Sequence, residues 1–431
     1  MSRLEPRVQP FPALIFNRER AGRLEELIAP PYDLIDKAYQ EKLYARSPHN
    51  IVRLELNRDP DPYGSAAATL TRWIAGGILK RTSPAIFLYS QTFGLDGQTY
   101  IRNGWVARIR LEEFATGRIL PHERTFPKAK EDRLQLLAAT HANISSVFGL
   151  YPSGNEELAA LTAEVAHGDP LLEVTDELGI LNEVRAVVSP AEINTVQHAL
   201  EPARVLIADG HHRYETALEY HRRQRTFPGE PTTLPIDYVM MTLVSFDDAG
   251  LVILPTHRII HHLSEAQIQT YKSRLGEKFT VEEFDDTETL LALLQSRGPG
   301  HIGATVKGTR PCIVSLRSHD YMFRALPQAQ EEVRKLDVAV LHALILDELL
   351  GITPETVRGG GDISYTINGR SALADVTSGK AAGAFLLGPP TVYDVEKVCN
   401  AGATMPEKST YFYPKLQTGL LINPLGQEQL K

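Results

Sequence analysis

Cysteine is scarce in this chain of 431 residues, which contains only Cys312 and Cys399. The two cysteines lie far apart in the sequence, so there is no Cys-x-x-Cys redox or zinc motif and no disulfide framework. Long apolar runs are also missing. No stretch approaches the roughly 18 apolar residues of a membrane-spanning helix, and the first residues lack the apolar core of a secretory signal peptide. We therefore expect a cytoplasmic protein that does not cross a membrane.

Familiar nucleotide and metal motifs are missing as well. The sequence contains neither the P-loop pattern G-x-x-x-x-G-K-[ST] nor the zinc protease pattern H-E-x-x-H. Gly298, Gly300 and Gly303 match the pattern G-x-G-x-x-G, but they follow a helical pattern and have Pro299 among them. A dinucleotide site requires a strand before these glycines and a helix after them. We therefore interpret the match as coincidental.

Positive charge is in deficit. The 45 Lys and Arg face 53 Asp and Glu, which gives a net charge of −8 and a pI of about 6.0. Proteins that bind nucleic acid backbones usually carry a basic excess, and no helix-turn-helix with a basic face is recognisable. Nucleic acid is therefore not an expected partner. The composition, 43% hydrophobic and 23% charged, is typical of soluble globular proteins.

The order of predicted elements indicates an α+β fold with mixed sheets and flanking helices rather than a regular doubly wound sheet. We expect three segments, 1–150, 151–265 and 266–431. Within them the sequence predicts two hairpins and one long helix: a hairpin of 85–90 with 98–109 around the turn Asp96-Gly97, a hairpin of 238–246 with 251–255, and a helix over 331–350 that ends at Gly351.

The most informative stretch is Val205–Ala217, VLIADGHHRYETA. An apolar strand ends in the turn Asp209-Gly210, and a helix begins within two residues. The unpaired N–H groups and the dipole of a helix start favour an anion, and Arg213 adds a guanidinium fork suited to phosphate oxygens.

Three neighbours of Arg213 complete this predicted phosphate site. His211 and His212 supply hydrogen-bond donors or a proton relay, and Asp209 can hold a cation such as Mg²⁺ beside the phosphates. We expect Gly210, His211 and Arg213 to bind phosphate, and His212 to take part in catalysis. The alternative is a capped helix with two incidental histidines.

A second polar cluster, Pro121–Thr125, places Glu123 between His122 and Arg124. A carboxylate with cationic neighbours suits a general base that removes the proton of a substrate hydroxyl. We therefore nominate Glu123 as the base, with His122 as a catalytic neighbour and Glu183 as the second candidate. The alternative is a salt-bridged surface loop.

Two further segments supply cationic side chains for nucleotide binding. His257 and Arg258 end a predicted strand. Near the C-terminus, Lys408, Ser409, Thr410 and Lys415 surround the aromatic residues 411–413. Aromatic rings can stack on an adenine while lysines neutralise phosphates. The same rings can equally pack into the core as part of a strand, and both interpretations stay open.

These motifs resemble two known groups of proteins. The sequence DGHHR at 209–213 is similar to the box of the ParB–sulfiredoxin superfamily, and especially of free serine kinases, in which the turn holds nucleotide phosphates. Nearly the whole chain resembles a bacterial family called domain of unknown function 1015. That resemblance is carried by Pro30–Asp33, His122-Glu123-x-Thr125, Ala208–Leu218 and Met405–Lys415. It implies a ParB–sulfiredoxin-like core with additional α+β segments.

The kinase resemblance implies a phosphotransferase that uses ATP or ADP with Mg²⁺ and acts on a small hydroxyl metabolite, with L-serine as the first candidate. In those kinases a glutamate is the base, which is why Glu123 is preferred. Two other classes stay open: a ParB-like nucleotide-binding regulatory protein, and a phosphatase or nucleotide hydrolase in which water replaces the acceptor. A homodimer is compatible with each of them.

Overall fold

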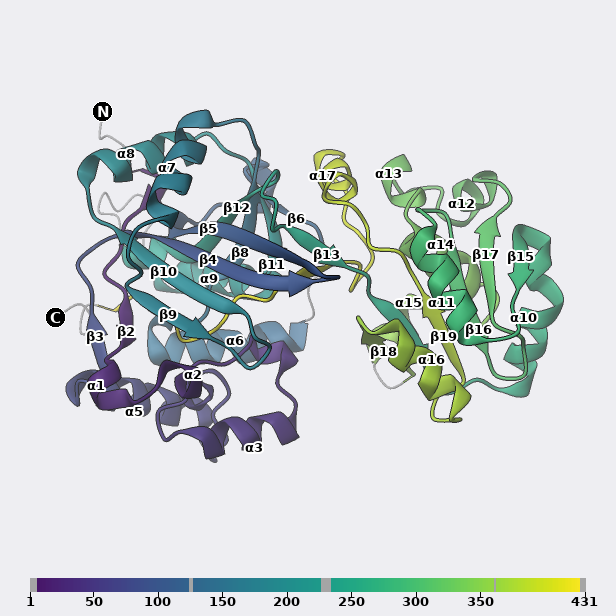
Figure 1. Cartoon of the computed structure of the whole chain (residues 1–431), viewed down its shortest axis with the longest axis horizontal. Coiled ribbons are helices and arrows are strands. Elements are labelled where there is room, and N and C mark those ends of the chain that lie inside the picture. Colours follow the sequence, from purple (N-terminus) through teal and green to yellow (C-terminus); the bar gives the residue numbers. More distant parts are fainter. Residues whose placement is uncertain (1–5, 124–126, 226–233, 360–361, 427–431) are drawn as a thin grey trace. The chain divides into compact units, whose positions relative to one another are not determined.

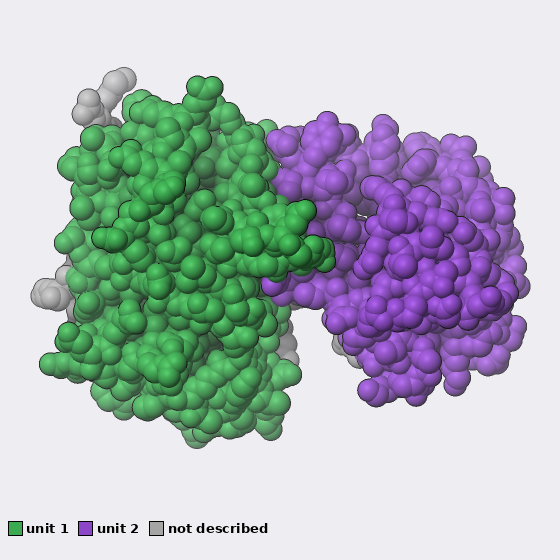
Figure 2. Space-filling model, in the orientation of Figure 1, with its two compact units in different colours: residues 1–121, 125–252, 414–431 green, residues 122–124, 253–413 purple. Residues whose placement is uncertain are grey.

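The computed structural model describes residues 6–123, 127–225, 234–359 and 362–426. It divides into two compact units (Figures 1 and 2). The first unit comprises residues 1–121, 125–252 and 414–431, and the second comprises residues 122–124 and 253–413. These units differ from the three consecutive segments expected from the sequence. The reason is that strands of the first two segments share one sheet, and the last residues of the chain return to that unit.

A mixed nine-stranded sheet forms the centre of the first unit (Figure 1). Its strands are β1 (Val8–Gln9), β4 (Ile86–Leu95), β5 (Gln98–Arg110), β6 (Ile119–Pro121), β8 (Val147–Tyr151), β9 (Leu172–Thr175), β10 (Leu181–Val187), β11 (Val205–Asp209) and β12 (Tyr238–Ser245). Their order is β6-β11-β8-β12-β5-β4-β10-β9, with β1 also paired to β5. The pairs β6–β11 and β8–β12 are parallel. The mixed sheet confirms the predicted α+β class.

Smaller elements complete the first unit. Strand β2 (Leu14–Phe16) pairs with β3 (Leu79–Arg81), and β7 (Ala142–Asn143) pairs with β21 (Asn423–Pro424). Its helices are α1 (Arg18–Ala21), α2 (Leu24–Leu27), α3 (Lys37–Arg46), α4 (Val52–Glu55), α5 (Pro62–Ala75), α6 (Pro127–Thr140), α7 (Glu156–Ala166), α8 (Pro190–Leu200) and α9 (His211–Gln224).

One predicted hairpin is confirmed and the other is wrong. Strands β4 and β5 pair directly, with Leu95 opposite Gln98, and both turn residues have positive φ, 50° at Asp96 and 76° at Gly97, as a tight hairpin requires. Strand β12 does not pair with β13 (Val252–Leu254), which pairs instead with β20 (Tyr411–Tyr413). Both edges of β12 are already occupied by β5 and β8, so no edge is left for a hairpin partner.

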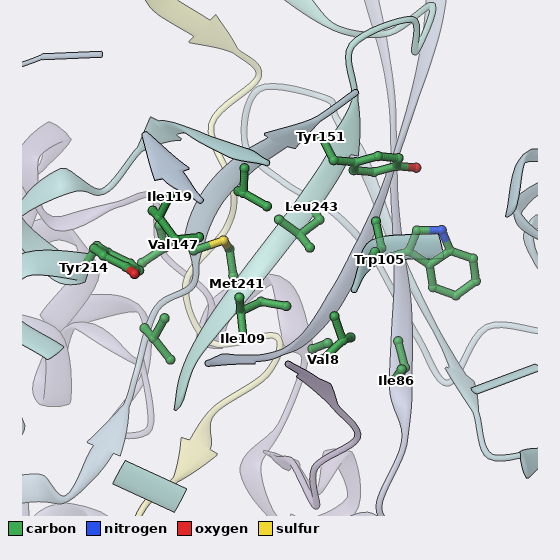
Figure 3. Packing of buried hydrophobic residues seen from close by; sticks show 14 of the residues in the cluster. Val8, Ile86, Trp105, Ile109, Ile119, Val147, Tyr151, Tyr214, Met241 and Leu243 are labelled. Atoms are coloured by element: carbon green, nitrogen blue, oxygen red, sulfur yellow. The ribbon is translucent and has the colours of Figure 1, made fainter. Parts of the chain in front are cut away.

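The core of the first unit joins the sheet to its helices (Figure 3). Buried side chains from several strands, among them Ile86, Val147 and Met241, form one cluster. Trp105 belongs to it and donates a hydrogen bond from Nε1 to Thr162 Oγ1 of α7 at 3.0 Å. Tyr214, in the first turn of α9, belongs to the same cluster. The start of α9 is therefore anchored in the main core.

The second unit contains a six-stranded antiparallel sheet. Its strands, in spatial order, are β15 (Phe279–Glu283), β17 (Cys312–Leu316), β16 (Ile302–Val306), β19 (Gly383–Leu386), β14 (His257–Ile260) and β18 (Ile363–Thr366). Its helices are α10 (Glu265–Lys278), α11 (Thr287–Ser296), α12 (Asp320–Ala325), α13 (Glu331–Arg334), α14 (Asp337–Val340), α15 (Pro354–Gly359), α16 (Gly369–Thr377) and α17 (Val392–Asn400). Leu290, Ile313 and Leu386 lie in a separate core.

The single helix predicted over 331–350 is wrong. The segment forms α13, then α14, then a π-helical stretch over Leu341–Asp347. Leu336 has an extended backbone, with φ −74° and ψ 132°, which interrupts the helix. An apolar repeat cannot distinguish one helix from short helices that follow one another in a core. Within the described ranges, no helix is long and apolar enough to cross a membrane.

Candidate functional site

The turn between β11 and α9 requires glycine at position 210. Gly210 has φ +87°, a conformation that L side chains rarely adopt. A Cβ atom there would also lie 2.8 Å from Arg213 Nε. Gly210 is the N-cap of α9 and has no side chain with which to cap it. The first N–H groups of α9 therefore begin directly at the turn, without a capping side chain from Gly210.

Tyr214 fixes the first turn of α9. Its side chain is fully buried and its hydroxyl group bonds to both backbone groups of Glu112, donating to the carbonyl at 2.8 Å and accepting from the N–H at 3.0 Å. Its ring stacks on Phe114 with centroids 5.4 Å apart. Burial raises the pKa of Tyr214 above its usual range, so the hydroxyl stays protonated. These contacts hold the backbone of the first turn of α9, to which the neighbouring Arg213 belongs.

Asp209, Arg213 and Lys415 form a charged group that we call the Asp209 cluster. Arg213 Nη2 lies 2.7 Å from Asp209 Oδ2, and Lys415 Nζ lies 2.6 Å from Asp209 Oδ1. Arg213 Nη1 donates to the carbonyl of Ser146. Arg213 Nε is buried and has no hydrogen-bond partner among the residues that the structure describes. Two cationic side chains thus share one carboxylate.

The cations of the cluster keep Asp209 ionised. Burial alone would raise its pKa, but Lys415, Arg213 and His211 together hold the pKa well below its usual range. Arg102 also lies within electrostatic reach of Asp209, and burial lowers the pKa of Arg102 to about 10, so this arginine remains charged at neutral pH. His211 is buried and His212 is partly exposed at the start of α9.

A second group, the Glu123 cluster, lies in the second unit and consists of His122, Glu123, Ser409 and Thr410. Glu123 Oε1 accepts hydrogen bonds from Ser409 N at 3.2 Å and Thr410 Oγ1 at 3.4 Å. His122 Nε2 lies 2.8 Å from Thr410 Oγ1 and 3.6 Å from Glu123 Oε1. Residues almost 290 positions apart in the sequence are thereby brought together.

Arg258 anchors the loop that carries Ser409 and Thr410. It is fully buried, and its Nη2 donates to the carbonyls of Glu407 at 3.2 Å and Lys408 at 3.1 Å. Its Nε donates to His342 Nε2 at 3.2 Å. Lys408 is exposed and has φ +55°, a strained value for a residue other than glycine. Arg258 therefore contacts the protein's own backbone, and its predicted nucleotide contact stays a prediction.

His257 is likewise buried, and its Nδ1 accepts a hydrogen bond from Leu387 N at 3.2 Å. Burial, with help from Arg258, lowers the pKa of His257 to about 4. A neutral, buried imidazole that accepts a backbone hydrogen bond is typical of a structural histidine. Phe412 is also buried, with its ring 5.9 Å from that of His122. This packing supports the core interpretation of residues 411–413.

The predicted site residues thus form two groups. Asp209, Gly210, His211, His212, Arg213 and Lys415 lie in the first unit, and His122, Glu123, His257, Arg258, Lys408, Ser409 and Thr410 lie in the second. Glu183, the second candidate for the base, pairs with Arg185 of its own strand at 2.7 Å. The roles predicted for these residues stay predictions.

The residues around Asp209 do not fit a magnesium ion. Each of its carboxylate oxygens already faces a cationic side chain, and the described part of the chain contains no group of three His, Cys, Asp or Glu that could hold a metal. Mg²⁺ prefers several oxygen ligands, which this donor set does not offer. Asp209 fits better as the carboxylate that orients Lys415 and Arg213.

Sequence reasoning missed a cavity of about 50 Å³ beside Arg213. Its polar lining includes Glu55, Arg133 and Ser145. Glu55 is buried, and its Oε1 lies 3.3 Å from Arg133 Nη1 and 3.2 Å from Ser145 Oγ. Arg133 lies over the ring of Tyr32 at 4.3 Å. Two sequence signals lie at or beside this cavity: Arg213, which lines it, and the motif Pro30–Asp33, whose Tyr32 contacts Arg133.

Several solved structures are similar to this chain at low sequence identity. A free serine kinase in complex with AMP is 12% identical, with a TM-score of 0.37, and the match covers 73% of this chain and 90% of the kinase. SbnI from Staphylococcus aureus, truncated at its C-terminus, is 12% identical with a TM-score of 0.37, and 75% of this chain and 92% of SbnI are covered. A conserved hypothetical protein from Pyrococcus furiosus is 12% identical with a TM-score of 0.34, over 69% of this chain and 89% of that protein.

The chemistry of the site therefore has to be argued from its own residues. Comparison with curated proteins gives no significant match. The family model described as protein of unknown function (DUF1015) matches residues 8–339. Since this match spans most of the 431 residues and includes both the Glu123 segment and the Asp209–Arg213 turn, the chain belongs to the DUF1015 family.

Proposed function

We propose that the protein is a nucleotide-dependent phosphotransferase that binds the phosphates of ATP or ADP at the Asp209 cluster. The observation that carries this proposal is the contact of Lys415 and Arg213 with the single carboxylate of Asp209 at the start of α9. A second cation brings surplus positive charge to a helix N-terminus, where anions are already favoured.

The three side chains have distinct roles in this proposal. Arg213 presents a planar fork to two phosphate oxygens, and its buried Nε is an additional donor. Lys415 supplies a point charge to the oxygen that develops charge during transfer. Asp209 holds both cations in place when no nucleotide is bound. His211 and His212 lie close enough in sequence to donate further hydrogen bonds.

The acceptor is a small hydroxyl metabolite, with L-serine as the first candidate because of the DGHHR resemblance. The cavity beside Arg213 supports this assignment, because its volume of about 50 Å³ is enough for a hydroxymethyl group. Glu55 in this cavity is a further candidate for the general base, in addition to Glu123 and Glu183. Unlike Glu123, it belongs to the same unit as the Asp209 cluster.

In the proposed reaction the substrate hydroxyl gives its proton to the carboxylate base. Its oxygen then bonds to the terminal phosphorus as the bond from that phosphorus to the bridging oxygen breaks. The nucleotide leaves with one phosphate fewer. Mg²⁺, which the kinase resemblance implies, would neutralise phosphate charge when bound with the nucleotide. No residue of the Asp209 cluster is assigned to hold it.

Product analysis tests the proposal. Purified protein is incubated with ATP or ADP, Mg²⁺ and L-serine or another hydroxy compound, and the products are identified by mass spectrometry. We expect a phosphorylated acceptor. The variant Lys415→Met should not form this product. Lys335 is an exposed lysine of the second unit, and its variant Lys335→Met should form as much product as the wild type. Loss of nucleotide phosphate without a phosphorylated acceptor would instead favour the hydrolase. Failure of ADP and ATP to bind would overturn the proposal.

Matched substitutions distinguish Glu55 from Glu123 as the base. Glu55→Gln and Glu123→Gln each keep the size of the side chain and remove its basicity. The variant of the true base should lose most of its turnover while retaining its nucleotide affinity. Equal turnover in both variants would exclude both carboxylates from the role.

A further inference from the structure

One face of the main sheet carries a row of buried polar side chains. Asn182 of β10 lies opposite Gln91 of β4, and Gln91 lies opposite Arg102 of β5. These three residues, which we call the buried polar row, are each at most 1% exposed. Amide and guanidinium groups are costly to bury unless they are hydrogen-bonded. Such a row in the middle of a sheet therefore calls for an explanation.

The members of the row bond to one another and to Tyr89. Asn182 Oδ1 accepts from Tyr89 Oη at 2.6 Å and from Gln91 Nε2 at 3.0 Å. Arg102 donates to Gln91 Oε1 and lies over the ring of Phe148 at 4.8 Å. These contacts leave each side chain little freedom to rotate. The buried polar row is thus a rigid network of connected side chains.

The buried polar row and Tyr89 hold the backbone of residues 414–417. Arg102 donates to the carbonyl of Pro414, and Gln91 Nε2 donates to the carbonyl of Lys415 at 3.1 Å. Gln417 N donates to Tyr89 Oη at 3.3 Å. This stretch is not a strand, so side chains take the place of ladder hydrogen bonds. The residue held at the centre is Lys415, whose Nζ contacts Asp209.

We propose that Gln91 and Arg102 are positioning residues of the phosphate site, because they fix the backbone of Lys415 so that its ammonium group meets Asp209. This inference rests on the proposed function of the Asp209 cluster. Arg102 also contributes positive charge within reach of Asp209. Both residues act through Lys415 and neither is assigned a contact with substrate.

Attachment of the chain end does not require this row. Thr418 and Ala29 exchange two backbone hydrogen bonds, at 2.8 and 3.1 Å. Asn423 lies opposite Asn143 in a separate strand pair, and Arg108 Nε donates to Asn423 Oδ1 at 2.8 Å. These contacts already hold residues 418–424 to the first unit. The additional bonds at 414 and 415 determine where the side chain of Lys415 points.

A double-mutant cycle between Gln91→Met and Lys415→Met tests the inference, with affinity for ADP measured by calorimetry and stability by thermal melting. Lys415→Met should weaken ADP binding roughly 10- to 100-fold. Gln91→Met should weaken it about 2- to 10-fold in the wild-type background. In the Lys415→Met background it should change ADP affinity no further, yet lower the melting temperature as before.

Thr162→Val is the matched control. It removes the hydrogen bond from Trp105 Nε1 in the same unit and should lower the melting temperature without changing ADP affinity. If Gln91→Met does not fold, Gln91→Asn keeps the amide but draws it back from the carbonyl of Lys415, and it enters the same cycle.

The outcomes separate this inference from the proposed function. Wild-type protein that binds ADP, together with a folded Gln91 variant of unchanged affinity, would overturn the positioning role alone. Equal losses of affinity in both backgrounds would also overturn it. Wild-type protein that binds neither ADP nor ATP would overturn the proposed function and this inference with it.

Discussion

At the residue scale, Arg213 joins the turn, the helix and the cavity. It contacts Asp209 and Ser146, leaves Nε without a partner among the described residues, and lines the cavity that contains Glu55. We expect Arg213→Ala to weaken nucleotide binding by about 1.5–3 kcal/mol, the usual value of a charge-assisted hydrogen bond, in a protein that still folds. Calorimetric titration with ADP measures this loss. Unchanged affinity in a folded variant would remove Arg213 from the site.

Two histidines of the second unit, the buried His257 and the partly buried His342, predict a pH dependence of stability. Burial lowers the pKa of His342 to about 3 and that of His257 to about 4, from 6.5. The unfolded chain therefore binds protons near pH 6.5 that the folded chain does not bind. The two histidines therefore leave the free energy of unfolding at its full value above pH 6.5. That free energy decreases as the pH falls towards 4 and then 3.

His342→Gln isolates one of these histidines. Glutamine can still accept the hydrogen bond from Arg258 Nε, but it does not titrate. We expect the melting temperature of this variant to fall less steeply than that of the wild type between pH 6.5 and pH 4. Melting curves recorded by circular dichroism across this range provide the measurement. If the melting temperatures of the variant and the wild type fall equally with pH, His342 does not contribute to the pH dependence.

At the scale of elements, the junction of β11 and α9 depends on Gly210. We expect Gly210→Ala to destabilise the protein by about 1–2 kcal/mol because of its positive φ, and to displace Arg213, whose Nε lies 2.8 Å from the added Cβ position. Nucleotide affinity should therefore fall as well. Denaturant unfolding and ADP titration measure the two effects.

Gly154→Ala, a substitution outside the junction of β11 and α9, is the control for Gly210→Ala. Gly154 has φ +96°, so alanine is strained there too, but no atom lies within 4 Å of the Cβ position. This variant should lose stability and keep its affinity for ADP. If Gly210→Ala behaves in the same way, the turn does not position Arg213 for a ligand.

At the scale of the whole molecule, residues 253–413 make up nearly all of the second unit, together with 122–124. This segment contains a complete six-stranded sheet and its own core. We expect the fragment 253–413 to fold alone, to melt cooperatively and not to bind ADP, since the Asp209 cluster lies in the other unit. Circular dichroism and calorimetry check these expectations. ADP binding by the fragment would place the phosphate site elsewhere.

The sequence by itself determined the local features of this protein. Asp96-Gly97 specified the hairpin of β4 and β5, and Val205–Ala217 specified a strand, a glycine turn and a helix, because such signals act between neighbours along the chain. The apolar patterns also indicated the α+β class. The break at Leu336 could not be predicted, because the spacing of apolar residues is the same in one long helix and in two short ones.

Only the tertiary structure decided which distant residues meet. Lys415 reaches Asp209 across 206 positions, and the cavity combines Glu55 with Arg133 and Arg213. The order of strands aligns Asn182, Gln91 and Arg102, and it sets β12 between β5 and β8. Long-range pairing depends on which sheet edges are available and on how the core is filled. Neither property can be read from the spacing of residues in a single sequence.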